Sequence, residues 1–158
     1  MPAILSHQEI RLEIQDSSFE ALDSWEFAHF LYLFRAAYSR GVELDLPEPE
    51  RVADDELYFT RRFAESFYSE STAPMIVAQL FAADWGDDEL RFQRISKSSP
   101  MEITCICLAS ALTLAVILSG GKASFVGFHF TLPPLGKGIK SLREAFRLSE
   151  PHRRRRLK

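Results

Sequence analysis

The chain has 158 residues, of which 46% are hydrophobic and 26% are charged, and its formal net charge is −3. This length and composition allow one buried core, so we expect a single domain over residues 1–150 and exclude a largely disordered chain. Charge is uneven: residues 1–136 carry 10 Lys and Arg against 20 Asp and Glu, whereas residues 137–158 carry 9 against 2. The sequence therefore predicts an acidic body followed by a disordered basic tail over 151–158.

The amino-terminal part predicts a strand followed by a helix. Residues 1–16 contain no basic segment followed by an apolar segment and a cleavage site, so we expect no secretory signal and a cytoplasmic or inner-membrane-associated protein. Apolar and charged residues alternate over 9–14, which predicts a half-buried strand. The residues Asp-Ser-Trp-Glu at 23–26 form a capping-box pattern, and the helix from Ser24 to Ser39 is apolar on nearly all sides. Other elements or another subunit must cover such a helix.

His29 is the histidine best placed for acid–base chemistry, because it lies within this apolar helix. No carboxylate or cysteine nearby in sequence forms a recognisable catalytic pair with it, so a structural role is favoured. The alternative is an enzyme whose pocket includes His29 with Trp25, Tyr32 or Tyr68. No catalytic residue, cofactor site or small-molecule substrate is assigned from the sequence.

The middle of the chain predicts a loop, two helices and a second strand. Residues 42–56 contain two prolines and many acids, which indicates a solvated connector. A helix with phenylalanines spaced by four follows over 55–68, and a shorter one is expected over 75–83. Alternation over 89–96 predicts a strand that pairs with the first one.

The longest apolar run extends from Ile103 to Gly121, with 19 residues and no charge. A helix of that length spans roughly 28 Å, close to the thickness of a bilayer core. The run predicts one long helix over about 100–119, which is either a single transmembrane span or a buried core helix. Small residues recur every four positions and define a helix-packing face for close approach of another helix: Cys107, Ala111, Ala115 and Ser119.

The two cysteines of the chain, Cys105 and Cys107, both lie in this run. On a helix they would point about 200° apart, which prevents a mutual disulfide or a shared metal ion. A strand would allow metal binding, but no histidine or second cysteine pair is nearby. We therefore expect no metal site.

The carboxyl-terminal part predicts a strand over 124–132 and an amphipathic helix over 138–148. The basic tail then offers a cluster of cations: Arg153, Arg154, Arg155, Arg156 and Lys158. Such a cluster can contact an anionic membrane surface, a protein or, less favourably beside an acidic body, a nucleic acid. Together the elements predict an α+β fold with a small sheet and four or more helices.

The strand at 90–95, the junction Ser99-Pro100-Met101-Glu102-Ile103 and the following apolar helix resemble small bacterial proteins of unassigned function that carry a Ser-Pro-(Leu/Met)-Glu-Ile junction. The resemblance covers roughly residues 88–146 and implies an architecture and a bacterial source, but no activity. The leading hypothesis is a non-enzymatic protein that acts by self-association or by binding another protein, as an accessory subunit or effector, with membrane association as one form. The alternatives are a soluble module that binds protein or nucleic acid through the tail, and an unrecognised enzyme.

Overall fold

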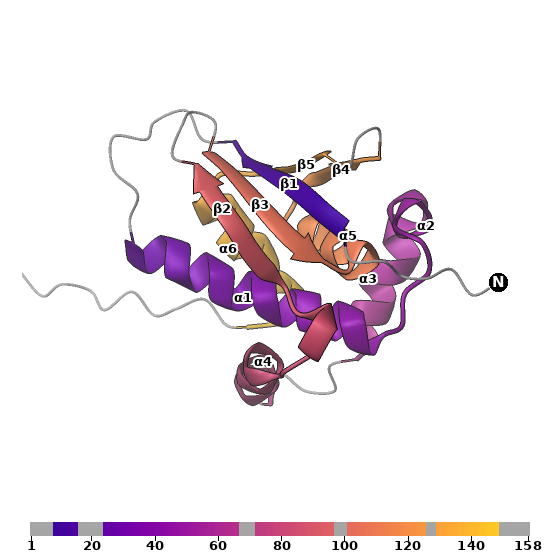
Figure 1. Ribbon diagram of the computed structural model, residues 1–158. Helices are drawn as coiled ribbons and strands as arrows, with labels where there is room; N and C mark the ends of the chain where they lie inside the picture. The colour runs from indigo at the N-terminus through magenta and orange to yellow at the C-terminus, as the bar shows by residue number, and fades with distance from the viewer. Residues whose placement is uncertain (1–7, 16–23, 67–71, 97–100, 126–128, 149–158) are drawn as a thin grey trace, which may run out of the picture.

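The computed structural model describes residues 8–15, 24–66, 72–96, 101–125 and 129–148. In this part of the chain a five-stranded sheet packs against six α-helices (Figure 1), so the predicted α+β class is confirmed. In chain order the elements are β1 (Gln8–Ile14), α1 (Ser24–Glu43), α2 (Pro49–Asp54), α3 (Glu56–Glu65), α4 (Ala73–Ala82), a short 3-10 turn (Gly86–Asp88), β2 (Arg91–Ser96), β3 (Met101–Cys107), α5 (Ala109–Leu118), β4 (Lys122–Ser124), β5 (His129–Leu132) and α6 (Leu135–Ala145).

The sheet is mixed, with the strand order β2-β3-β1-β5-β4. Its central strand β1 runs antiparallel to β3 and parallel to β5, and the other neighbouring pairs are antiparallel. Ile10 lies opposite Cys105, and Leu12 lies between Ile103 and Phe130. All five side chains are buried, because alternate residues of a strand point to the same face. They form the inner face of the sheet, and the intervening, mostly charged or polar residues form its outer face.

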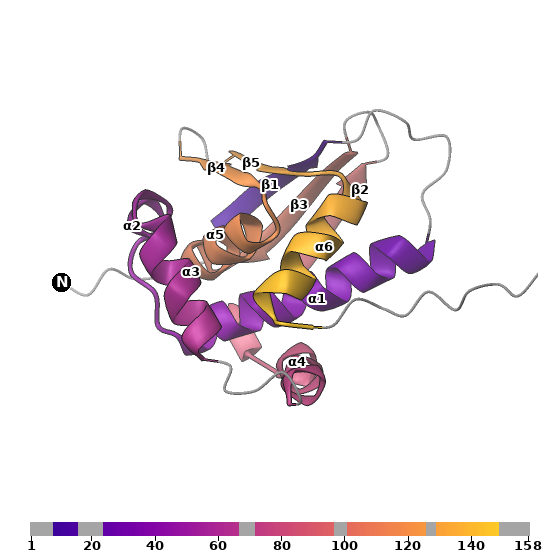
Figure 2. The same ribbon diagram turned by 180° about the vertical axis from the view of Figure 1, so that it is seen from behind.

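The helices cover one face of this sheet. Figures 1 and 2 show α1, α5 and α6 against the inner face, α2 and α3 beside α5, and α4 on the side of α1 away from the sheet. The buried layer between sheet and helices includes Phe30 and Phe34 from α1, Leu112 from α5 and Leu142 from α6. In both views no helix of the described residues lies on the outer face, where Glu9 and Arg11 are exposed.

The long apolar run is divided between a strand and a helix, and the prediction of one helix over 100–119 is therefore wrong in its first half. Residues 101–107 form β3, in which alternate side chains are buried, and only Ala109–Leu118 are helical. Pairing with β1 and β2 on both sides gives the β-branched residues of this segment a strand environment. Among the described residues no helix is both long and apolar enough to cross a membrane.

The helix α5 is the buried core helix that the sequence offered as the alternative to a membrane span. All ten of its residues are buried, and the chain leaves it at Gly120 with a φ of +84°, a conformation that glycine adopts readily. Glycine thus ends this helix.

Other boundaries differ from the predictions in ways that tertiary contacts explain. The predicted connector over 42–56 contains α2, which begins at Pro49 and buries Val52. The predicted strand over 124–132 is two antiparallel strands, β4 and β5. The helix α1 continues past Ser39, because Gly41 allows close packing against α5: a Cβ atom at Gly41 would lie 3.1 Å from Cα of Ala111.

The helix-packing face predicted from the small residues is not a single helical stripe. Cys107 belongs to β3, whereas Ala111 and Ala115 lie on α5 and Ser119 caps its end. All four are fully buried in this chain, and α1 makes the close approach at Ala111. In this fold the small residues therefore serve packing within one molecule.

Candidate functional site

The edge strand β2 is the most exposed regular element of the sheet. It pairs with β3 on one side and stands last in the strand order on the other. The side chains of Phe92 and Ile95 face the inner side of the sheet, yet Phe92 is 37% exposed and Ile95 is 45% exposed. A register shift between Phe92 and Arg94 marks a bulge. At the opposite edge of the sheet β4 has only three residues, which is too short to pair with an added strand in the same way.

The start of β2 is held to α1 by polar contacts. Arg35 donates hydrogen bonds to the carbonyl oxygens of Phe81 (2.9 Å) and Ala83 (3.0 Å), and its guanidinium lies 2.8 Å from a carboxylate oxygen of Glu89. Tyr38 donates from its hydroxyl to the carbonyl of Asp88. These bonds fix the connection between α4 and β2, so the edge is presented in a defined position.

The outer face of the sheet bears charges in rows across the strands. Arg94 lies in line with Thr104 and Arg11, and Arg11 is followed by His129 in β5. The side chain of His129 contacts Glu13, with Nε2 of His129 2.7 Å from Oε2 of Glu13. Over the described ranges no group of three His, Cys, Asp or Glu side chains is placed to hold a metal ion. In the described part of the chain this face is thus a polar surface that carries charges of both signs.

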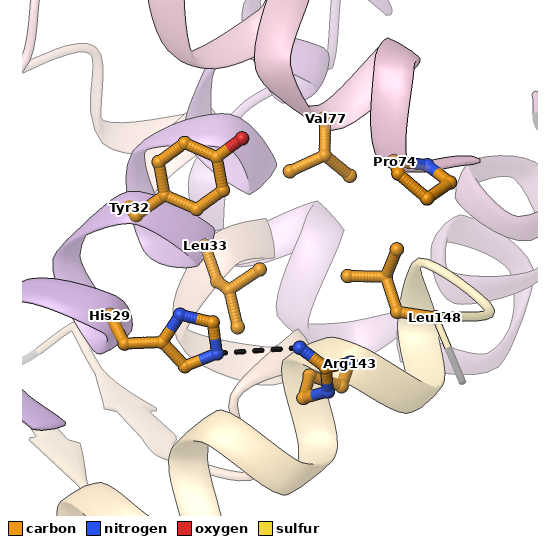
Figure 3. Close-up of a pocket in the computed structure, with 7 residues that line it drawn as sticks. All are labelled: His29, Tyr32, Leu33, Pro74, Val77, Arg143 and Leu148. Carbon is orange, nitrogen blue, oxygen red and sulfur yellow. Dashed lines mark hydrogen bonds between the residues drawn. The ribbon is translucent and has the colours of Figure 1, made fainter. Parts of the chain in front are cut away.

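A small cleft lies between α1, α4 and α6, and it contains two of the residues considered in the sequence. Its volume is about 220 Å³. Its polar residues are His29, Tyr32 and Arg143, and Figure 3 shows His29 and Arg143 side by side at one end. The rest of the lining is apolar: Leu33, Pro74, Val77 and Leu148.

The surroundings of His29 favour the neutral form of its imidazole. Its Nε2 lies 3.4 Å from NH1 of Arg143, a contact in which the guanidinium donates and the imidazole accepts. Burial, together with the positive charge of Arg143, lowers the pKa of His29 below its usual value of 6.5. The ring also stacks on Trp25, with the centroids 5.2 Å apart. Trp25 stands beside the cleft and is not one of its lining residues, and Tyr68 lies outside the described residues.

The two cysteines lie on the inner face of β3, so the helical geometry expected for them is wrong. Both are fully buried, and their sulfur atoms are 4.0 Å apart. The contact with Cys105, reinforced by burial, raises the pKa of Cys107. Cys107 is therefore a protonated thiol, and both sulfur atoms lack access to solvent, which suits core packing rather than redox or nucleophilic chemistry.

Sequence reasoning singled out His29 and Tyr32, which line the cleft. It missed Arg143, the cation of the cleft, and Ile95, the most exposed apolar residue of the edge strand β2. Arg143 reads as one of several cations on the polar side of α6, and Ile95 reads as an ordinary strand residue. The sequence contains no signal for either role, because each depends on which elements are neighbours in space. The basic tail at 153–158 lies outside the described residues.

Comparisons of the chain with protein-family models, with curated proteins and with solved structures gave no match.

Proposed function

We propose that this chain is a non-enzymatic protein-binding module that receives an extended segment of a partner at the free edge of β2. The observation that carries the proposal is the exposure of Phe92 and Ile95, 37% and 45%, on an edge strand of six residues. An added strand would pair with the outward backbone groups of β2 and cover these two side chains. The contacts of Arg35 favour binding, because they hold the edge in place before the partner arrives.

The partner segment is expected to alternate acidic and apolar residues. Arg91 and Arg94 point to the outer face of the sheet, opposite Ile106 and Thr104 of β3. Residues of an added strand directly opposite these arginines would lie about 5 Å away, where opposite charges attract and like charges repel. A second copy of this chain would bring two further arginines to the same seam, so an acidic segment of another protein is the better occupant.

A peptide titration tests this proposal directly. The full chain is titrated into a fluorescent peptide of alternating glutamate and valine, and into a matched peptide of alternating lysine and valine, with anisotropy as the readout. We expect saturable binding of the glutamate peptide and slower hydrogen exchange in β2 in the complex. Ile95→Lys places a charge on the edge and should abolish binding. Met75→Lys is the control, because Met75 is 59% exposed on α4, away from β2.

A charge reversal gives the sharpest outcome. Arg94→Glu should weaken the glutamate peptide about tenfold and strengthen the lysine peptide, since each cross-strand charge pair contributes roughly 0.2 to 1 kcal/mol in either direction. Equal binding of both peptides by the wild-type chain would refute the charge argument. Sedimentation that shows a dimer lost in Ile95→Lys would assign the edge to a second copy and overturn the acidic partner.

A further inference from the structure

We propose that two copies of this chain associate through the outward face of α4, with the two helices antiparallel across a twofold axis. This outward face consists of the six exposed residues of α4: Pro74, Met75, Ala78, Gln79, Phe81 and Ala82. The face is separate from the edge of β2, so the proposal does not rest on the function described above.

The outward face of α4 is apolar and points away from the rest of the described chain. With 3.6 residues per turn its six residues lie on one side of the helix, and Gln79 is the only polar residue among them. Met75 is 59% exposed and Phe81 is 39% exposed. Figures 1 and 2 show α4 on the far side of α1 from the sheet, with no other described helix or strand beyond it. A second apolar surface that covers this face would remove it from water, which is favourable.

The outward face is held in a fixed position by contacts with α1. Nε of Arg35 donates a hydrogen bond to the carbonyl oxygen of Phe81 at 2.9 Å, and its guanidinium lies 5.7 Å from the centroid of the Phe81 ring. The same ring packs on Tyr32, with the centroids 4.7 Å apart. Because the helix is already ordered, association does not have to offset the entropy of ordering it.

The two ends of α4 differ in charge, which favours antiparallel pairing with a second copy. Asp84 is exposed two residues beyond the end of the helix. At the start of the helix Pro74 lines the same cleft as Leu148, which places the neighbouring exposed residue Arg147 near that end. The chain continues from there into residues 149–158, with four Arg and one Lys against one Glu. In an antiparallel pair the acidic end of each α4 lies beside the basic end of the other, so the face is complementary to itself.

The same charges favour a second copy over a membrane surface. No residue of α4 is charged, so the two outward faces meet without repulsion between like charges. An anionic membrane would attract the basic end of the helix but would repel the exposed carboxylates of Asp84 and Asp87 at the other end. The twofold pair matches both ends at once.

The size of the outward face sets the expected affinity. A helix of ten residues is about 15 Å long, so a pair of them buries less than the roughly 1,200 to 2,000 Å² of a standard interface. Ala78 and Ala82, in the middle of the face, allow the two helices to approach closely. We therefore expect a reversible dimer with a dissociation constant of about 10 to 100 μM.

Sedimentation equilibrium of the full chain, from about 10 μM to 1 mM, tests the proposal. Ala78→Glu places a carboxylate in the middle of the face in both copies and should weaken dimerisation at least tenfold. Leu57→Glu is the matched control, because Leu57 is 72% exposed on α3, and it should leave the dissociation constant within twofold. A chain that is monomeric throughout, even if it binds vesicles of anionic lipid, or a dimer unchanged in Ala78→Glu, would overturn the proposal.

A charge exchange tests the antiparallel orientation. Asp84→Arg and Arg147→Asp each bring like charges together at both ends of the interface, so each variant alone should dimerise about tenfold more weakly. Aspartate suits position 147, where φ is +56°. An equimolar mixture of the two variants restores opposite charges at both ends and should dimerise nearly as well as the wild type. Asp54→Arg, a control at an exposed position of α2, should have no effect, and a mixture no better than its components would refute the orientation.

Discussion

Removing the hydroxyl of Tyr38 tests how the apolar run is divided into a strand and a helix. The junction between β3 and α5 is Leu108, and its backbone N–H donates to the hydroxyl oxygen of Tyr38 at 2.9 Å. The same hydroxyl donates to the carbonyl of Asp88, which precedes β2. Tyr38 is only 1% exposed, so Tyr38→Phe removes both hydrogen bonds without admitting water. One side chain on α1 therefore fixes both the start of α5 and the approach to β2.

The expected loss of stability follows from the backbone groups of Leu108 and Asp88 that lose their hydrogen-bond partner. A buried N–H without a partner costs about 1 to 3 kcal/mol, and Leu108 is only 8% exposed. We therefore expect Tyr38→Phe to lower the free energy of unfolding by about 2 kcal/mol, which is a large part of a typical stability of roughly 5 to 15 kcal/mol. With a urea dependence of about 2 kcal/mol per M, the midpoint of unfolding should fall by about 1 M.

Urea unfolding followed by circular dichroism provides the assay, and Tyr58→Phe provides the matched control. Tyr58 is 54% exposed on α3, so loss of its hydroxyl should change stability by less than about 0.5 kcal/mol. If Tyr38→Phe unfolds at the wild-type urea concentration with an unchanged slope, the hydroxyl does not hold the junction and the reasoning fails.

Three further predictions concern glycine packing, the thiols and pH. Gly121→Ala should destabilise the fold by about 2 kcal/mol or prevent folding, because its Cβ would overlap the carbonyl oxygen of Thr131; a melting temperature within 2 °C of the wild type would contradict this. Cys105 and Cys107 should react with a thiol reagent only as fast as the chain unfolds, and rapid labelling of the native protein would show that β3 is accessible. Because burial and a neighbouring guanidinium lower the pKa of His29 in the folded state, the unfolded chain protonates first as the pH falls below 6.5, and stability should fall with it. His29→Gln should reduce this loss, which urea titrations between pH 7.5 and 5 would measure, and an identical pH dependence in the two chains would refute it.

The sequence determined the features that depend on local periodicity. Alternation over 9–14 predicted β1 within one residue, because a strand with one buried face repeats every two residues whatever it pairs with. The capping pattern before Trp25 placed the start of α1 at Ser24, and the spacing of Phe59 and Phe63 identified the buried side of α3. These signals lie within a few residues of one another and need no knowledge of distant partners.

Tertiary structure decided how the apolar run is divided, and with it the environment of the whole segment. A run buried on every side has no polar face, so its sequence does not distinguish a strand between two strands from the first turns of a helix. Pairing of Cys105 with Ile10 and Phe92, together with the bond from Leu108 to Tyr38, determines the strand and the start of α5. All three of these contacts join residues that belong to separate elements of the fold.

The candidate sites depend on the same kind of information. His29 and Arg143 are 114 positions apart in sequence, and they meet because α6 packs beside α1. The exposure of Ile95 follows from the place of β2 at the end of the strand order, which no periodicity within six residues encodes. Sequence alone therefore determined which segments are strands or helices where one face is polar, whereas only the folded chain decided which faces, edges and charges come together.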